Sequence, residues 1–255
     1  MIPKIIHQIF IPIHYDRMPD KWKEASDKWK IYHPDFEYKL WGYDDCLQLL
    51  KQYYPWFLDT WFHYKYKIQQ IDAVRYFILY HYGGFYIDMD YKPNRRIDSY
   101  LLESHTCVVT QHDFFINNLS NGFIGCIKQH PFMEHSIRHL IDYKNKSIYT
   151  GKHNHVINST GPNFLTSMFH QYSRNDIFVL SHFMSNSGCD ICNHSICKPG
   201  YMFDTSNGKS WYGNDSKLYE HFRCNYKLYL VFLLLLIFIC ILSFYNHKKF
   251  QLYLK

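Results

Sequence analysis

The sequence predicts an α/β domain built on a parallel sheet, followed by one apolar helix near the C-terminus. Three observations lead to this prediction. Up to residue 180, short apolar runs alternate with longer segments of helical periodicity, which is the pattern of strands joined by crossover helices. The chain has 255 residues, 47% of them hydrophobic, enough for one domain with a full core. Residues 228–245 carry no charge.

The first quarter of the chain alternates strand and helix patterns. Lys4–Phe10 (KIIHQIF) is an apolar run with strand character, and Phe36–Trp41 (FEYKLW) alternates like a strand. Between them, Asp20–Tyr32 has tryptophans seven residues apart on one helix face, and Asp44–Tyr53 follows as a short helix. The order strand, helix, strand, helix is typical of a parallel sheet.

Residues Lys67–Tyr82 (KIQQIDAVRYFILYHY) give the clearest helix pattern in the chain. Apolar residues recur at helical spacing, and Gly83 follows as a C-cap with positive φ. Asp72 and Arg75 are three residues apart, so they lie on one face of this helix. The apolar neighbours predict a mostly buried helix, in which an ion pair requires a reason.

The rest of the domain continues the alternation. Expected strands are Phe85–Ile87, Thr106–Thr110, Phe123–Ile127 and Ile177–Leu180, and expected helices are Pro131–Tyr143 and one that starts near Thr160-Gly161-Pro162. Residues 184–216 are rich in Ser, Asn and Gly and are expected to form a long loop. Loops of that length are usually functional.

The uncharged run Leu228–Tyr245 is long enough to cross a membrane as a helix. At 1.5 Å per residue it spans about 27 Å, close to the thickness of a bilayer core. Lys227 precedes the run, and Lys248 and Lys249 follow it. We therefore expect three parts: a domain over 1–220, a transmembrane helix over 228–245 and a short basic tail over 246–255.

The side of the membrane on which the domain lies stays open. The flanking lysines are nearly balanced, so the positive-inside rule does not decide. The first ten residues, MIPKIIHQIF, lack the pattern of a signal peptide. Five Asn-x-Ser/Thr sequons would matter only in a lumen, at Asn118, Asn145, Asn158, Asn193 and Asn214. An ER- or Golgi-type endomembrane is compatible with a domain on the cytosolic side and with a domain in the lumen.

Charge and cysteine content narrow the class of partner. The net charge of +6 is dispersed, without a Lys/Arg block that would follow a phosphate backbone, so we expect no nucleic acid. A mildly basic chain suits anionic membranes or a phosphorylated substrate. Cys189, Cys192, His194 and Cys197 are spaced like zinc ligands, but a second C-x-x-C pair is missing. Free thiols or one local disulfide is the alternative.

Two aspartates, Asp88 and Asp90, follow directly after the buried strand Phe85–Ile87. In open α/β sheets, ligands bind outside the carboxyl ends of the strands. Residues i and i+2 of an extended segment point the same way, and two neighbouring carboxylates stay ionised at low cost only beside a cation. Mg²⁺ and Mn²⁺ prefer oxygen ligands shared with phosphates. The pattern predicts a metal–phosphate site.

The surrounding motifs are more specific. A helix with Asp72-x-x-Arg75 leads through Tyr82-Gly83-Gly84 into Phe-Tyr-Ile-Asp88-Met-Asp90. This order resembles the DXD sugar-binding region of glycosyltransferases, in particular family 32, which includes the mannosyl-inositol-phosphoceramide synthases and initiating α-1,6-mannosyltransferases. Further stretches similar to that family are Ile2–Gln8, Ser120–Phe123 with His130-Pro131-Phe132, Ser159–Pro162, and Ser210-Trp211. The resemblance runs from residue 2 to about 215.

The resemblance implies a GT-A fold of Rossmann-like type, a nucleotide-sugar donor and Mn²⁺ or Mg²⁺. Asp90 would be a direct metal ligand, and Asp88 would hold the ribose or the metal and its water shell. Asp72 and Arg75 would face the donor sugar. GDP-mannose is the favoured donor, with UDP-hexoses next, and transfer would retain the anomeric configuration. The acceptor would be a lipid or a glycan.

The same resemblance implies roles for four residues outside the helix and the DXD motif. Phe10 would stack against the base, Ser210 and Trp211 would close over the diphosphate, and Asn121 would lie near the sugar or acceptor. One departure is Tyr212, where the family pattern leads us to expect His after the Ser-Trp pair.

Two alternatives come from other classes. A phosphatase of the haloacid dehalogenase type also has Asp-x-Asp after an apolar strand, but on its first strand and with an acidic pair downstream. Here at least two strands precede Asp88. A membrane protein that binds a sugar nucleotide or a partner without catalysis is the second alternative, which Tyr212 keeps open. Metal-dependent turnover of a donor would separate it from an enzyme.

Overall fold

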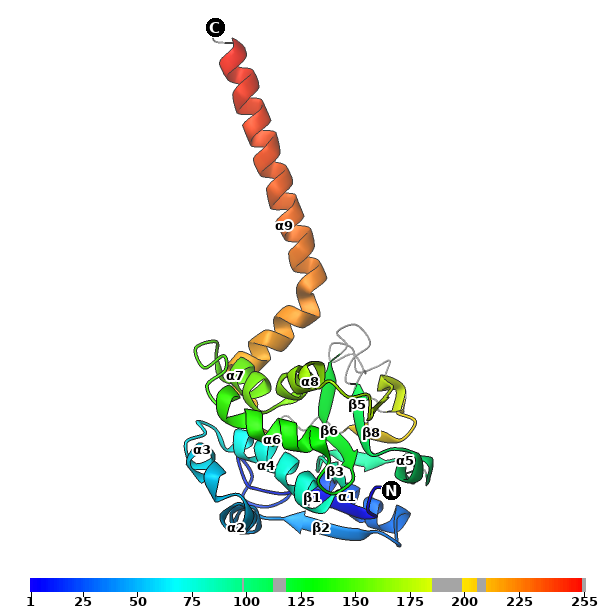
Figure 1. The fold of residues 1–255 in the computed structure, drawn as a ribbon. Coiled ribbons are helices and arrows are strands. Elements are labelled where there is room, and N and C mark those ends of the chain that lie inside the picture. Colours follow the sequence, from blue (N-terminus) through cyan, green and yellow to red (C-terminus); the bar gives the residue numbers. More distant parts are fainter. Residues whose placement is uncertain (98, 112–117, 185–198, 206–209, 254–255) are drawn as a thin grey trace. The chain divides into compact units, whose positions relative to one another are not determined.

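The structure is a computed structural model that describes residues 1–97, 99–111, 118–184, 199–205 and 210–253, with side chains described as far as residue 244. It divides into two compact units, Met1–Gly213 and Asn214–Lys255 (Figure 1). The first unit holds the sheet and the expected site, and the second is one long helix.

The first unit alternates strands and helices along most of its length. Its elements are β1 (Ile5–Ile9), α1 (Asp20–Tyr32), β2 (Glu37–Trp41), α2 (Tyr43–Tyr53), η1 (Pro55–Phe57), α3 (Leu58–Phe62), α4 (Lys67–Tyr82), β3 (Gly84–Ile87), β4 (Tyr91–Pro93), α5 (Ser99–Ser104), β5 (Cys107–Gln111), β6 (Leu119–Cys126), α6 (Pro131–Tyr143), α7 (Lys152–Ser159), α8 (Pro162–Gln171), β7 (Ile177–Leu180), η2 (His182–Met184) and β8 (Phe203–Thr205).

Six strands form the main sheet in the order β2-β1-β3-β6-β5-β7. The pairs β1–β2, β1–β3 and β5–β7 are parallel, whereas β6 is antiparallel to both of its neighbours. The predicted α/β class is confirmed, but the sheet is mixed rather than wholly parallel. Because β6 runs against β3, the start of β6 lies at the edge where β3 ends.

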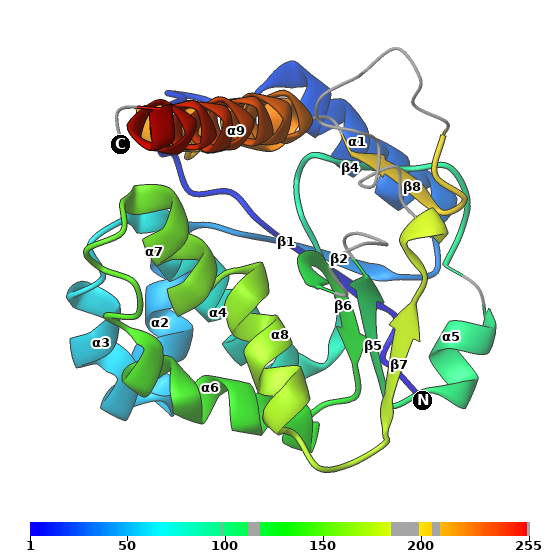
Figure 2. The same ribbon diagram turned by 90° about the horizontal axis from the view of Figure 1, so that it is seen from above.

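Helices cover both faces of this sheet (Figure 2). Alternate strand residues point to opposite faces, so Tyr86 joins one core cluster while Phe85 and Ile87 join the other. The larger cluster packs α2, α4, α6, α7 and α8 against the sheet. The smaller one packs α1, α5 and the β4–β8 pair. The result is a three-layer arrangement with the sheet in the middle.

Two glycines connect α4 to β3. Gly83 and Gly84 have φ of +69° and +88°, a region that residues with a Cβ rarely adopt. Space is also lacking, since a Cβ on Gly83 would lie 2.6 Å from the Lys128 backbone nitrogen, and one on Gly84 would lie 2.6 Å from the Ile5 carbonyl oxygen. This tight connection places Asp72 and Arg75 of α4 beside the end of β3.

A second, two-stranded sheet follows the aspartates. In β4, Tyr91 pairs with Thr205 and Pro93 with Phe203 of β8, antiparallel. Asn94 and Arg95 extend this contact: Asn94 Nδ2 donates to the Gly200 carbonyl (2.8 Å), and Arg95 Nε donates to the Tyr201 carbonyl (2.6 Å). The segment after Asp90 is thereby fastened to residues far along the chain.

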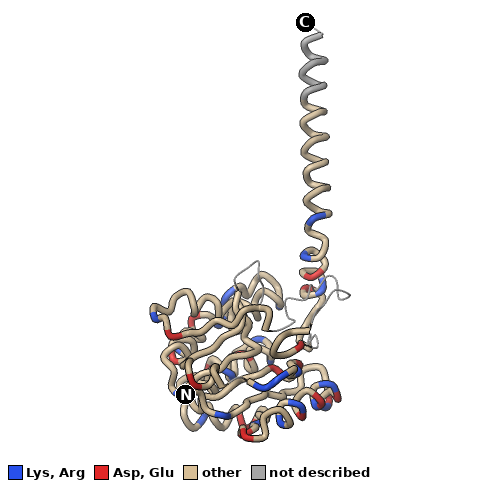
Figure 3. Tube along the Cα trace, turned by 90° about the vertical axis from the view of Figure 1, so that its right-hand side faces the viewer, with Lys and Arg blue, Asp and Glu red and all other residues tan. Residues whose placement is uncertain are grey.

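The second unit is the helix α9 (Asn214–Tyr253). Residues 214–244 are long and apolar enough to cross a membrane, and the side chains of residues 228–244 are exposed. Figure 3 shows neither Lys, Arg, Asp nor Glu along this stretch, whereas both signs of charge are mixed over the first unit. Large apolar side chains in such number are seldom left in water. The helix is therefore a candidate membrane span.

Several element predictions need correction. The strand expected at Phe123–Ile127 begins four residues earlier, at Leu119. The short elements α3, α5, α7, β4 and β8 were not predicted. Within the loop expected over 184–216, the described residues include β8 and the start of α9. The Cys189, Cys192 and Cys197 group lies outside the described residues.

Candidate functional site

The DXD aspartates lie at the sheet edge where the parallel strands end. β1, β2 and β3 run in one direction, so Asp88 follows the carboxyl end of β3 beside that of β1. The start of β6 is adjacent, because Ile87 pairs with Phe123 and the Asp88 N–H donates to the Gly122 carbonyl (2.8 Å). This is the location at which α/β sheets usually bind ligands.

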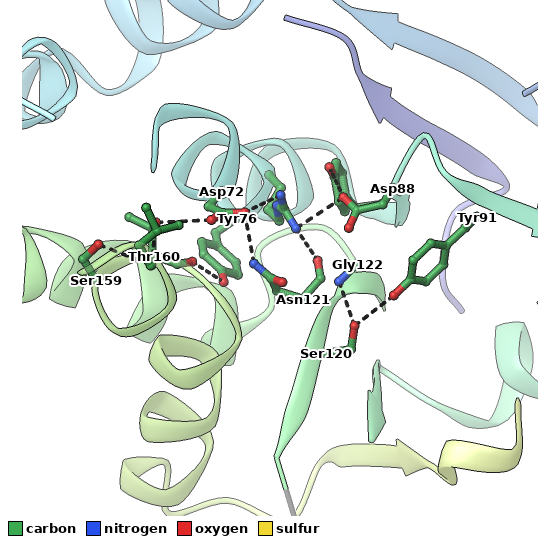
Figure 4. Close-up of polar contacts among 12 residues, drawn as sticks. Asp72, Tyr76, Asp88, Tyr91, Ser120, Asn121, Gly122, Ser159 and Thr160 are labelled. Carbon is green, nitrogen blue, oxygen red and sulfur yellow. Dashed lines mark hydrogen bonds and ion pairs between the residues drawn. The ribbon is translucent and has the colours of Figure 1, made fainter. Parts of the chain in front are cut away.

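Helix α4 contributes a buried ion pair to the same place. Nη2 of Arg75 donates to Oδ1 of Asp72 at 2.5 Å, and the two residues are only 2% and 5% exposed. Asp72 accepts two further hydrogen bonds, from Asn121 Nδ2 (3.2 Å) and from Thr160 Oγ1 (3.4 Å). Figure 4 shows these groups converging from α4, β6 and the end of α7. Buried charges of this kind require partners, and among the described residues only Nε of Arg75 in this ion pair lacks one.

Arg75 connects the ion pair to the DXD motif. Its Nη1 donates to the Asn121 carbonyl oxygen (2.6 Å) and lies 3.4 Å from Oδ1 of Asp88. The guanidinium also stacks over the Tyr86 ring, 4.5 Å from its centroid. Burial alone would lower the pKa of Arg75, but Tyr86, Asp72 and Asp88 together raise it above its ordinary value. The charged side chain of Arg75 thus links its own helix α4 to the start of β6 and to Asp88 after β3.

The Asp72 carboxyl has an unusual pKa. Burial raises the pKa of Asp72 from 3.8 to about 6; Arg75 opposes this change, and Asp88 adds to it. Burial therefore outweighs the ion pair. Near neutral pH the group is still mainly ionised, so that it can accept hydrogen bonds, but it gains a proton under mildly acidic conditions.

Asp88 is held by one oxygen and presents the other. The Tyr86 hydroxyl donates to Oδ1 (2.7 Å), and the side chain of Asp88 is 31% exposed. Among the described residues nothing donates to Oδ2. That oxygen lies over Gly122, where a Cβ would come within 2.6 Å of it. Gly122 therefore leaves the space that the free carboxylate oxygen occupies.

The residues present fit a divalent metal shared with a ligand. Asp88 supplies an oxygen without a protein donor, and Asp90 follows two residues later, partly exposed. The described residues contain no group of three or more His, Cys, Asp or Glu side chains that would hold a metal alone. Two carboxylates that share the ion with phosphate oxygens are the usual arrangement for Mg²⁺ beside nucleotides.

Polar residues that sequence reasoning did not single out complete this site. Nε2 of Gln8 donates to the Asp88 carbonyl (3.3 Å), and the Tyr38 hydroxyl donates to Oε1 of Gln8 (2.6 Å). Tyr91 and Ser120 share a hydrogen bond of 3.1 Å on the other side of Gly122. Gln8 is a polar residue near the end of an apolar strand pattern, and this position was the signal that could have identified it as a site residue.

The other predicted residues lie around this cluster. Phe10 follows β1 at the same sheet edge, with its ring edge-on to Trp22 at 6.4 Å. Trp211 stacks on His153 of α7 at 5.4 Å. No contact joins Ser210 or Trp211 to Asp88 within the described part of the chain. The structure therefore brings together Asp72, Arg75, Asp88 and Asn121 directly, and the remaining four less closely.

Comparison of the sequence with known protein families gives a match. Residues 19–108, which include α4 and both aspartates, match the family described as "Glycosyltransferase sugar-binding region containing DXD motif".

The chain belongs to this DXD glycosyltransferase family.

Relatives with curated names agree with the family assignment. Mannosyl phosphorylinositol ceramide synthase SUR1 of Saccharomyces cerevisiae is 35% identical over 225 residues, which cover 86% of this chain and 54% of the relative. Inositol phosphoceramide mannosyltransferase 1 of Schizosaccharomyces pombe is 28% identical over 258 residues, covering 97% and 75%. The chain thus spans about half the length of the first of these relatives.

A solved structure shows a weaker likeness. The PaToxG glycosyltransferase is 17% identical, with a TM-score of 0.49, and the match covers 67% of this chain and 68% of that one. The order of the strands in this chain bears on the phosphatase alternative. Here β1 and β2 precede β3, so the phosphatase alternative, which requires the motif on its first strand, does not apply.

Proposed function

We propose that this DXD glycosyltransferase moves a hexose, with mannose favoured, from a nucleotide sugar to the inositol phosphate headgroup of a ceramide lipid. GDP-mannose is the favoured donor and UDP-hexoses are next, while a glycan is the alternative acceptor. The curated relatives are named for mannosyl transfer to inositol phosphoceramide, which supports this choice. The candidate membrane helix α9 supports a lipid acceptor, since it would keep the domain near an endomembrane.

One observation carries the proposal: the Arg75 guanidinium joins the Asp72 carboxylate to the Asp88 carboxylate at the end of β3. An enzyme that transfers a sugar from a diphosphate needs a group that binds sugar hydroxyls close to a group that binds the metal. Asp72 and Asp88 have these two chemistries, and Arg75 fixes their separation. A purely structural ion pair would not require the second, partly exposed carboxylate of Asp88.

Asp88 and Asp90 would hold Mn²⁺ or Mg²⁺ together with the diphosphate. When bound, the ion neutralises the negative charge that develops on the leaving group. Oδ2 of Asp88 is the oxygen suited to this, because Oδ1 is occupied by Tyr86 and Arg75. Arg75 is held by Asp72, Asp88 and the Asn121 carbonyl, so we assign it a positioning role.

Asp72 would accept hydrogen bonds from hydroxyls of the donor hexose. An ionised carboxylate accepts such bonds about twice as strongly as a neutral group, so donor binding should require Asp72 without its proton. In the transfer, the bond from C1 of the hexose to the diphosphate oxygen breaks, and a bond from C1 to the acceptor oxygen forms. The acceptor proton passes to the departing diphosphate. This route retains the anomeric configuration.

The remaining predicted residues would bind the nucleotide. Phe10 would stack on the base, and the indole nitrogen of neighbouring Trp22 is buried without a partner among the described residues, so it is a donor that a ligand can satisfy. Ser210 and Trp211 would close over the diphosphate, and the His153 ring stacks on that of Trp211.

The test uses the full chain in lipid nanodiscs that contain inositol phosphoceramide. Nucleotide sugars are offered singly with Mn²⁺, with and without EDTA, and product is followed by mass spectrometry. Transfer from one donor should be lost with EDTA and in Asp90→Ala. The matched control Asp142→Asn, on the exposed end of α6, should keep full activity. Chelation or Asp90→Ala without effect would contradict the proposal, and donor binding without turnover would favour a binding protein.

A further inference from the structure

Three asparagine side chains form a connected row outside the cluster around Asp72. Nδ2 of Asn118, just before β6, donates to Oδ1 of Asn163 in α8 (3.3 Å). Nδ2 of Asn163 donates to Oδ1 of Asn158 in α7 (3.1 Å). All three are partly exposed. We call Asn118, Asn163 and Asn158 the amide row.

The amide row is attached to the two elements that hold Asp72. Asn118 lies three residues before Asn121, which donates to Asp72, and Asn163 lies three residues after Thr160, which also donates to Asp72. A hydrogen bond from the Leu119 N–H to Thr166 Oγ1 (3.0 Å) fixes the start of β6 to α8. Asn118 to Asn121 runs into β6, and three residues of extended chain span about 10 Å, which is room for one six-membered ring.

The row retains unused hydrogen-bonding capacity. Each amide nitrogen has two N–H groups, and each of these three uses one in a bond to the protein: Asn118 to Asn163, Asn163 to Asn158, and Asn158 to the Asn154 carbonyl (2.7 Å). Oδ1 of Asn118 accepts no hydrogen bond from the described residues. A partly exposed line of neutral donors and an acceptor is complementary to vicinal hydroxyls rather than to a charged group.

We infer that the amide row is the acceptor subsite and binds the hydroxyls of a cyclitol or hexose ring on the acceptor headgroup. This inference rests on the proposed function and extends it. The ring would lie between the amide row and the donor hexose at Asp72, with one hydroxyl directed at C1 of the donor. Three amides that hold each other in a fixed line lose little freedom on binding, so the acceptor hydroxyl is oriented before reaction.

The test separates acceptor binding from donor binding. Full-length protein in nanodiscs is given GDP-mannose and Mn²⁺, and transfer to soybean phosphatidylinositol is measured as a function of its mole fraction. Donor hydrolysis without acceptor is measured in parallel. Asn163→Ala and Asn118→Ala should each raise the acceptor KM by about tenfold, corresponding to one or two lost hydrogen bonds. The KM for donor hydrolysis should change less than twofold.

The matched control is Asn154→Ala, on the same helix as Asn158 but with its side chain bonded to the Thr150 carbonyl; it should leave both KM values unchanged. Asn163 lies in the first turn of α8, so Asn118→Ala keeps the test valid if Asn163→Ala does not fold. An unchanged acceptor KM in an enzyme that transfers mannose would overturn this inference alone. Absence of transfer in the wild type to this probe and to inositol phosphoceramide would overturn the proposed function as well.

Discussion

Replacing Asp72 by Asn should change how the stability of the domain depends on pH. In the folded protein the pKa of this carboxyl is about 6 because of burial, compared with 3.8 ordinarily. At 1.36 kcal/mol per pKa unit, folding therefore disfavours its ionised form by about 3 kcal/mol. Asn has nearly the shape of the protonated acid and cannot ionise, so the variant lacks this penalty.

The sign follows from proton linkage. Because the folded state binds the proton more tightly than the unfolded chain, Asp72 contributes most to the free energy of unfolding below about pH 4. That contribution is lost as pH rises from about 4 through 6. Between pH 4.5 and pH 8, Asp72→Asn should therefore gain about 2 kcal/mol relative to the wild type. The altered contact with Arg75 adds an offset that does not depend on pH.

The assay is urea unfolding of the full chain in detergent micelles, followed by tryptophan fluorescence. All six tryptophans lie between residues 22 and 211, so the signal reports on the first unit. Asp142→Asn, on an exposed surface, serves as the control whose difference from wild type should stay constant with pH. Measurements at pH 4.5, 5.5, 6.5 and 8 define the curve.

Two results would refute the reasoning. A constant difference between Asp72→Asn and the wild type would mean that Asp72 ionises at its ordinary pKa. A difference that falls with rising pH would mean that the ion pair with Arg75 outweighs burial. In either case the loss of donor binding that we expect below about pH 6 would need another explanation.

Other substitutions test the remaining parts of the structure. Tyr86→Phe removes the 2.7 Å hydrogen bond to Asp88, and we expect about tenfold weaker binding of Mn²⁺–GDP by calorimetry, since a bond to a charged group contributes about 1.5 kcal/mol. Gly122→Ala places a Cβ 2.6 Å from the Asp88 carboxylate and should abolish that binding, whereas Gly42→Ala, with its nearest atom at 3.3 Å, should bind normally. Leu235→Arg should release part of the protein on carbonate extraction, because a central Arg costs about 3 kcal/mol on insertion; full retention would argue against a membrane span.

Sequence periodicity was sufficient where an element is long and one-sided. The bounds Lys67–Tyr82 of α4 were predicted and confirmed, because apolar spacing and the glycine pair define both ends. β6 was predicted four residues too short, since Leu119-Ser120-Asn121-Gly122 has the composition of a turn. Leu119 and Ser120 extend the strand because Gln111 and Thr110 of β5 pair with them, which is information that the local sequence lacks.

The sequence likewise predicted one part of the candidate site and missed another. Asp88 and Asp90 were identified from their place after a buried strand, and Asp72 with Arg75 from a charged pair in an apolar helix. The orientation of Asp88 was not, because it depends on Tyr86 and on the space above Gly122, whose partners are fixed only by the sheet register. Arg75 was predicted to face the sugar, and this role stays a prediction; the sequence did not indicate that its guanidinium lies between Asp72, Asp88 and the Asn121 carbonyl.

The pairing of β4 with β8 has a consequence for how this family can vary. Pro93 lies opposite Phe203, so the chain between them forms a closed segment that starts just after the DXD aspartates and returns beside β4. Because β4 and β8 pair with each other at the two ends of this segment, insertions or deletions within it change its length without moving β8 away from β4. Parts of this segment that do not contact Asp72 or Asp88 can therefore change in length while β4 keeps its place after the two aspartates.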